Sequence, residues 1–126
     1  MKYLIVMSLV LFCTVAVGEE NADGNHLIQA CGASVSAIDG APYLAADDLH
    51  DAYFCLGLVH GVSDILVSQG KITAVTVTQS IRVVDRYLKT HPKDLSDRDT
   101  LLVVQALTEA FPKSTHQLNE SPSTEN

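Results

Sequence analysis

Cysteine and histidine are the side chains most able to do chemistry in this chain, and their spacing limits what that chemistry can be. Cys55 has His50 and His60 five residues to either side. Five residues of α-helix turn through about 500°, which takes each histidine off the face that carries the sulfur. A nucleophilic cysteine needs such a base within reach. The chain has no C-x-x-C pair to support a redox enzyme. The spacing therefore argues against a catalytic cysteine.

Metal and acid–base chemistry have little more support. His60 and Asp64 can meet at i, i+4 spacing, but a stable zinc site needs three or four protein donors. Most acidic residues fall at expected helix starts or on outer faces, where capping and solvation explain them: Asp47, Asp48, Asp85, Asp97, Asp99 and Glu109. The sequence has neither a phosphate-binding glycine loop nor a G-x-S-x-G motif. We therefore predict no catalytic residue, no metal, no cofactor and no enzyme.

Length and charge exclude other classes of function. The chain has 126 residues, enough for one domain, and no apolar run reaches the roughly 18 residues of a membrane-spanning helix. Its 15 acidic residues outnumber 8 Lys and Arg, for a net charge of −7. Nucleic acid and anionic membrane surfaces both attract basic proteins instead. We therefore expect neither as a partner.

The first 18 residues have the pattern of an export signal. Lys2 is followed by an apolar stretch, and small residues, Ala16 and Gly18, precede a cut after position 18. A lipoprotein anchor on Cys13 is the alternative, but Phe12 stands where a small residue is usual. A cleaved signal implies the periplasm, an oxidising compartment. The mature chain then keeps two cysteines, Cys31 and Cys55, which favours one disulfide worth about 3 kcal/mol in the chain-entropy model.

Composition divides the mature chain into three parts. Residues 19–24 form a short polar leader, and residues 25–112 carry the apolar periodicity of a folded domain. Residues 113–126 are rich in Ser, Thr, Asn, Glu and Pro, which predicts a disordered polar tail.

Four helices are expected in the domain, and no segment shows convincing strand alternation. The first begins with Asn25 as N-cap and ends near Gly32. Residues 34–45, which include Gly40 and Pro42, are expected to form a loop. The result is a small all-α bundle with one disulfide.

The second helix is expected from about Ala46 to Ser68, with an apolar face wide enough to be contacted on two sides. Its residues at helical spacing are Leu49, Ala52, Tyr53, Leu56, Val59, Ser63 and Leu66. Gly57 and Gly61 lie in the same helix, where each costs about 1 kcal/mol relative to alanine. We interpret them as a site of close helix packing, within the domain or between subunits. A local kink is the alternative.

The third helix begins at a capping box formed by Thr76 and Gln79, and Asp85 with Lys89 makes an i, i+4 pair on its outer side. Its expected buried stripe is Val77, Ile81, Val84 and Leu88. The fourth helix follows residues 96–99 and ends at Pro112. Its expected apolar side is Leu101, Val104, Ala106, Leu107 and Phe111.

Several motifs occur in the order and spacing of a known family. They are Gly24-Asn25-His26-Leu27 with Cys31, Cys55-Leu56-Gly57-Leu58-Val59-His60-Gly61-Val62-Ser63-Asp64, Val75-Thr76 with Gln79, and Ala106-Leu107-Thr108-Glu109-Ala110-Phe111-Pro112. Together they resemble the Rap/Tai family, the immunity proteins of type VI secretion amidase effectors. The resemblance extends over nearly all of residues 24–112.

The resemblance implies a small, helical, disulfide-bonded periplasmic protein. Such a protein binds a cell-wall amidase delivered by rival cells and blocks its active site, in some members as a homodimer. The chain departs from the family at Leu58, where Tyr is usual. It also lacks a second cysteine pair, whose positions correspond to residues 70–72 and Lys113.

The acidic turn between the third and fourth helices is the best candidate for a partner-binding surface: Asp94, Leu95, Ser96 and Asp97. Residues 70–76 are the second candidate, and either segment can equally be a solvated connection. A different function is also open. HdeA/HdeB-like acid-stress chaperones of the periplasm are likewise small, helical and bridged by one disulfide.

Overall fold

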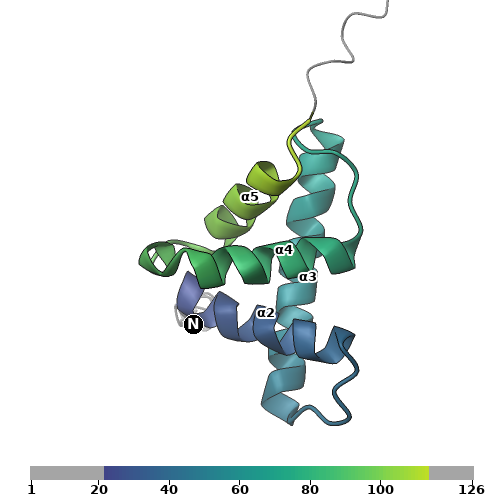
Figure 1. Cartoon of the computed structure of the whole chain (residues 1–126), viewed down its shortest axis with the longest axis vertical. Coiled ribbons are helices and arrows are strands. Elements are labelled where there is room, and N and C mark those ends of the chain that lie inside the picture. Colours follow the sequence, from purple (N-terminus) through teal and green to yellow (C-terminus); the bar gives the residue numbers. More distant parts are fainter. Residues whose placement is uncertain (1–21, 114–126) are drawn as a thin grey trace, which may run out of the picture.

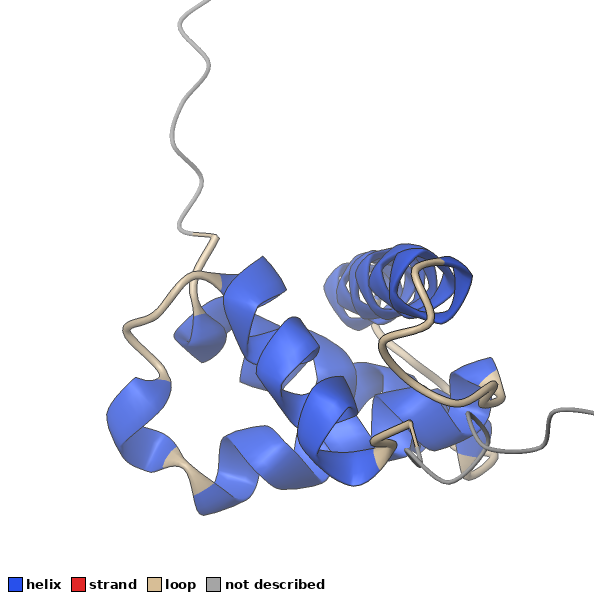
Figure 2. Cartoon of the chain, turned by 90° about the horizontal axis from the view of Figure 1, so that it is seen from above, coloured by secondary structure: helices blue, strands red, loops and turns tan. Residues whose placement is uncertain are grey.

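The computed structural model describes residues 22–113, which form four α-helices and one short 3₁₀ helix (Figure 1). These elements are α2 (Gly24–Ile38), α3 (Ala46–Ser68), α4 (Val77–Thr90), η1 (Pro92–Asp94) and α5 (Asp99–Ala110). The expected export signal and all but the first residue of the expected tail lie outside the described part. Figure 2 shows helices and loops and no strand over residues 22–113. The predicted all-α fold is confirmed.

The longest helix, α3, is the axis on which the others pack. α2 and α4 lie side by side across it, and α5 contacts both α4 and α3 (Figure 1). By length and composition alone α3 could cross a membrane. However, its first turn carries Asp47 and Asp48, and a buried stripe along it faces the other helices. That arrangement is typical of the central helix of a bundle.

A disulfide joins α2 to α3 at the centre of the core, as the sequence predicts. Cys31 and Cys55 are fully buried, with their Cα atoms 5.1 Å apart. The largest fully buried apolar side chains around them come from all four helices: Leu27, Val59, Ile81, Val84, Leu88, Leu102, Val103 and Leu107.

The first helix differs from its prediction at both ends. Its N-cap is Asp23 and not Asn25, because the Asp23 carboxylate accepts hydrogen bonds from the backbone N–H groups of Asn25 (3.0 Å) and His26 (3.1 Å). The helix also continues past Gly32 to Ile38, through much of the expected loop. Tertiary contacts explain the extension, since a buried Ser34 hydroxyl donates to the Ala52 carbonyl at 2.6 Å.

The third helix follows its prediction closely. The capping box is present, with Thr76 Oγ1 accepting from the Gln79 backbone and Gln79 Oε1 accepting from the Thr76 backbone, each at 3.3 Å. Lys89 pairs with Asp85 at 2.7 Å. Asp85 is buried, however, and does not lie on an outer face. Because α4 is contacted by α2 as well as by α3 and α5, its buried stripe is wider than the one expected.

The fourth helix is rotated relative to its expected face. Leu102 and Val103 are fully buried, whereas Leu101, expected on the apolar side, is 46% exposed. The first residue of α5 explains the rotation, because Asp99 is itself buried and its backbone N–H donates to the Ala22 carbonyl at 3.1 Å. This contact fixes which side of the helix turns toward the core.

The segment before α4 and the segment after α5 lie next to each other. Ile72 and Pro112 form an isolated antiparallel bridge, and the Thr73 N–H donates to the Phe111 carbonyl at 3.1 Å. A Cβ atom built on Gly70 would lie 3.1 Å from Lys113 Nζ. Backbone hydrogen bonding therefore joins the segment before α4 to the end of α5.

Candidate partner-binding site

The acidic turn, residues Asp94–Asp97, is held rigidly by the start of α2. The Leu95 carbonyl accepts from Asn25 Nδ2 at 3.1 Å, and the Asp97 carbonyl accepts from the Gly24 backbone N–H at 3.1 Å. Asp94 and Leu95 are half-buried, and Ser96 and Asp97 are exposed. The turn thus presents a carboxylate and a hydroxyl to solvent on a backbone that is fixed from behind.

Gly24 is the residue that allows this contact. A Cβ atom added to it would lie 2.6 Å from Leu102 Cδ1, 2.8 Å from Leu95 Cα and 2.9 Å from Leu95 O. Two of these are backbone atoms of the turn, which cannot move aside as the end of a side chain can. Any other residue at position 24 would therefore push the acidic turn away from α2.

The N-cap of α2 stands beside the same turn. Asp23 forms an isolated bridge with Arg98, directly after the acidic turn. Hydrogen bonds from the backbone N–H of His26, from the Asn25 side chain and from the Asn25 backbone, with the charge of His26, lower the pKa of the Asp23 carboxyl. Asp23 therefore keeps its charge, and its capping bonds, at pH values below the ordinary aspartate range.

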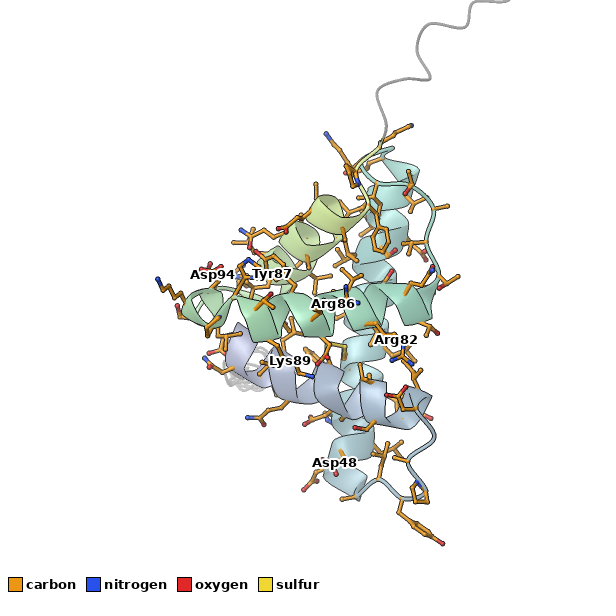
Figure 3. The ribbon with its side chains drawn as sticks, in the orientation of Figure 1. Asp48, Arg82, Arg86, Tyr87, Lys89 and Asp94 are labelled. Carbon is orange, nitrogen blue, oxygen red and sulfur yellow. A yellow bond between two sulfur atoms is a disulfide. The ribbon has the colours of Figure 1, made fainter. Side chains whose placement is uncertain are left out.

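Negative charge gathers around the acidic turn. Partial burial raises the pKa of Tyr87, and the carboxylates of Asp94, Glu109 and Asp97 raise it further. Figure 3 shows Asp94 next to Tyr87, at the end of α4. The Tyr87 ring stacks on His91 with centroids 4.0 Å apart. Three carboxylates therefore lie near the Tyr87 hydroxyl, and the exposed Lys93 and Arg98 flank the turn in the sequence.

A second surface, which we call the apolar groove, lies at the opposite end of α2. It has a volume of about 210 Å³ and is lined by side chains that include Ala37, Ile38, Leu49, Tyr53, Leu56 and Val77. Tyr53 is 65% exposed and Leu49 is 45% exposed, although both were expected on the buried face of the long helix. Helical spacing identified their common face but could not show that α2 and α4 leave it partly uncovered.

Gly57 and Gly61 do not pack against another helix within residues 22–113. Both are exposed, and a Cβ atom built on either would meet no atom within 4 Å. The expectation of close packing inside the domain is therefore wrong. Packing between subunits stays a prediction.

In the described part of the chain, the histidine–carboxylate contacts form two separate groups. His60 and Asp64 lie 3.4 Å apart on the exposed side of α3. Asp51 lies 3.4 Å from His26 and 3.8 Å from His50. Over residues 22–113 the structure has no group of three or more His, Cys, Asp or Glu side chains able to hold a metal ion. Residues 70–76, the second candidate segment, include the buried Ile72, and Thr73 and Ala74 beside it are exposed.

Comparison with known proteins identifies the family. Residues 23–112 match the family of Rap1a immunity proteins. This range covers the bundle from the Asp23 cap to the Ile72–Pro112 bridge. A search of curated proteins and a search of solved structures returned no match. Because the match spans well over half of the 126 residues, the chain belongs to the Rap1a immunity protein family.

Proposed function

We propose that this chain is a periplasmic immunity protein that binds and inhibits a peptidoglycan amidase delivered by type VI secretion. The family match over residues 23–112 carries the proposal. The disulfide supports a location outside the cytoplasm, because the cytoplasm keeps thiols reduced. Inhibition by occlusion needs a fixed surface and no reaction, which suits a bundle of this kind.

The acidic turn is our candidate for the surface that meets the amidase. Its backbone is fixed by Gly24 and Asn25, so little conformational freedom is lost when a partner binds. Its carboxylates, with Glu109 nearby, favour a partner that is basic at the contact. Charge complementarity of this type raises the rate of association and falls with added salt.

The test first establishes whether a secreted amidase gene lies beside this one, and then uses that amidase with the mature, disulfide-bonded protein. We expect tight binding by titration calorimetry and loss of peptidoglycan hydrolysis at equimolar inhibitor. Asp97→Lys is expected to slow association, whereas Asp64→Lys, on an exposed side chain of α3, serves as the matched control. Because Asp64 lies on the same helix face as Gly61, light scattering first checks that the control keeps the oligomeric state of the unmodified protein. Absence of binding, with full hydrolysis in the presence of excess protein, would refute the proposed function.

An acid challenge separates this proposal from the acid-stress chaperone. An immunity protein has no need to unfold, so near-ultraviolet circular dichroism should be retained at pH 3 and the dye ANS should stay unbound. Loss of that signal together with ANS binding and suppression of client aggregation would support the chaperone instead.

We also propose that the exposed face of α3 around Gly57 and Gly61 is the contact of a homodimer. Glycines allow two helix backbones to approach closely, and the structure leaves open space over both. Light scattering should then give twice the mass of the chain, and Gly61→Lys should give the monomer mass. A monomer at every concentration of the unmodified protein would rule out this contact.

A further inference from the structure

We propose that the apolar groove is a second contact for the amidase, and that it takes an apolar side chain from a segment flanked by Lys or Arg. This inference rests on the proposed function and adds a surface to it. The acidic turn lies at the N-terminal end of α2, and the groove lies at the C-terminal end.

Exposed apolar side chains concentrate at the groove. Seven large apolar residues are exposed among residues 22–113, and four of them line it: Ile38, Leu49, Tyr53 and Leu56. Scattered exposed apolar residues are ordinary on a protein surface, but a cluster around one concavity is typical of an interaction site. Water in such a groove makes few hydrogen bonds with its walls, so its displacement favours an apolar occupant.

The size of the groove suits a side chain better than a free small molecule. Its volume of about 210 Å³ is below the roughly 300–1,000 Å³ of typical small-molecule sites. Protein interfaces often use single apolar anchors that enter pockets of this kind, and such anchors carry much of the binding energy. The occupant is therefore a residue of a partner protein.

Charge at the groove identifies the neighbours of that residue. Asp47 and Asp48 lie in the first turn of α3 but do not line the groove: Asp48 is about 100° around the helix from Leu49 and Asp47 about 200°. Neither forms an ion pair within the described part of the chain, and Asp48 is the nearer carboxylate. Arg82, labelled in Figure 3, does not line the groove, and its guanidinium is held by Asp39 at 2.6 Å. The free charge beside the groove is thus negative and favours basic flanking residues on the partner.

The same charges disfavour the other possible occupants. In a symmetric dimer formed through the groove, Asp47 and Asp48 of one subunit would lie near Asp47 and Asp48 of the other, and these like charges would repel each other. Residues 114–126 contain two Glu and no Lys or Arg, so this segment of the chain does not complement the rim either. A segment of another protein with an apolar residue flanked by Lys or Arg complements both the apolar walls of the groove and the negative charge beside it.

Two contacts at the two ends of one helix fit the dimensions of a specific interface. α2 has 15 residues and is about 22 Å long at 1.5 Å per residue. Sites separated by that length fall within the footprint of a standard interface of about 800 Å² per partner. Binding at both sites fixes the orientation of the amidase on the bundle, which neither site does alone.

The experiment compares a groove variant with a control on the same helix. Leu49→Ala combined with Tyr53→Ala removes two exposed walls of the groove, and Ile65→Ala removes an exposed apolar side chain of α3 outside it. Because Ile65 lies one turn from Gly61, light scattering first checks that this control keeps the oligomeric state of the unmodified protein. With the secreted amidase encoded beside the gene as the probe, we expect Kd to rise at least thirtyfold for the groove variant, mostly through faster dissociation. The control should stay within twofold of the unmodified protein.

Charge reversal tests the flanking residues. Asp47→Lys with Asp48→Lys should slow association about tenfold at low salt, and the difference should shrink at 0.5 M salt. The first turn of α3 loses favourable helix-dipole contacts in this variant, so thermal melting is measured alongside. If melting shows that the fold is weakened, the single variant Asp48→Asn is used in place of the double variant and is expected to slow association by a smaller factor.

Each outcome separates the two proposals. A groove variant that binds as tightly as the unmodified protein overturns the groove contact and leaves the proposed function standing. An unmodified protein that does not bind the amidase overturns the proposed function, and the groove contact with it. A dimer that becomes a monomer only in the groove variant would mean that a second copy occupies the groove, which also overturns the inference.

Discussion

The two ends of α2 are built in different ways. At its N-terminal end, Gly24 and Asn25 donate hydrogen bonds to the acidic turn, and there is no room for even one methyl group. At its C-terminal end, Ile38 faces a partly empty apolar groove. One end fixes the direction of polar groups, and the other leaves surface that a partner can fill. The same helix thus combines rigid positioning with unused apolar area.

Removal of the disulfide should lower the free energy of unfolding more than any of the substitutions that follow. It should also loosen the two ends of α2 to different degrees. Cys31→Ala with Cys55→Ala releases a loop of 24 residues, which the chain-entropy model values at about 3 kcal/mol. Hydrogen exchange should show residues 32–38 losing protection before residues 24–27. Within residues 22–113, the Ser34 hydroxyl ties that half to α3, and an exposed Arg82–Asp39 pair holds its end to α4. The start of α2 is instead bonded to the acidic turn through a backbone N–H. Equal loss of protection at both ends would contradict the contrast.

A methyl group added at Gly24, at the N-terminal end of α2, should lower the free energy of unfolding almost as much. Gly24→Ala forces the Leu95 backbone to shift, and overpacking of this kind costs about 1–3 kcal/mol. Gly32→Ala is the matched control in the same helix, because its added Cβ meets no atom within 4 Å. The control should be stabilised by about 0.5–1 kcal/mol, since alanine favours helix over glycine. Urea unfolding measures both, and a neutral Gly24→Ala would refute the close approach.

The Asp23 cap should give a smaller effect that depends on pH. Because hydrogen bonding lowers the pKa of this carboxyl in the folded state, its contribution is fully present above the unfolded value of about 3.9. It is lost as the pH falls through the lower, folded value. Asp23→Asn should therefore melt close to the unmodified protein, while Asp23→Ala should melt lower at pH 7 and converge with it near pH 2. A gap that persists in acid would mean that the carboxylate is not the cap.

The smallest effect on stability is expected at the groove. Leu49→Ala and Tyr53→Ala remove side chains that are 45% and 65% exposed, so each should change the free energy of unfolding by less than about 0.5 kcal/mol. Chemical denaturation tests this in the free protein. A large loss would show that these residues stabilise the bundle, and would remove the contrast with the rigid end.

Local signals in the sequence predicted much of the fold. The bounds of α3, the capping box at Thr76 and the pairing of Cys31 with Cys55 all depend on patterns within one segment or on a count of two cysteines. The length of α2 was missed because Gly32 has a low helix propensity, and the disulfide and the Ser34 bond to α3 override it. Tertiary contacts, which no short window contains, decided that boundary.

The site was predicted less well than the fold for the same reason. The acidic turn was placed from its composition, but the need for glycine at position 24 arises from contacts with Leu95 and Leu102, more than 70 residues away. The Asp23 cap depends on local hydrogen bonds with Asn25 and His26, so the sequence contained its signal. The groove was missed because apolar spacing predicts a face, not whether a neighbour covers it. Its signal was present in Tyr53, an aromatic residue with a polar tip that tolerates exposure.

The disulfide bears on the order in which the chain can fold. Both of its cysteines precede residue 56, so α2 and the first half of α3 can be linked covalently before α4 and α5 have packed. The later helices then add to a pair of helices that is already joined.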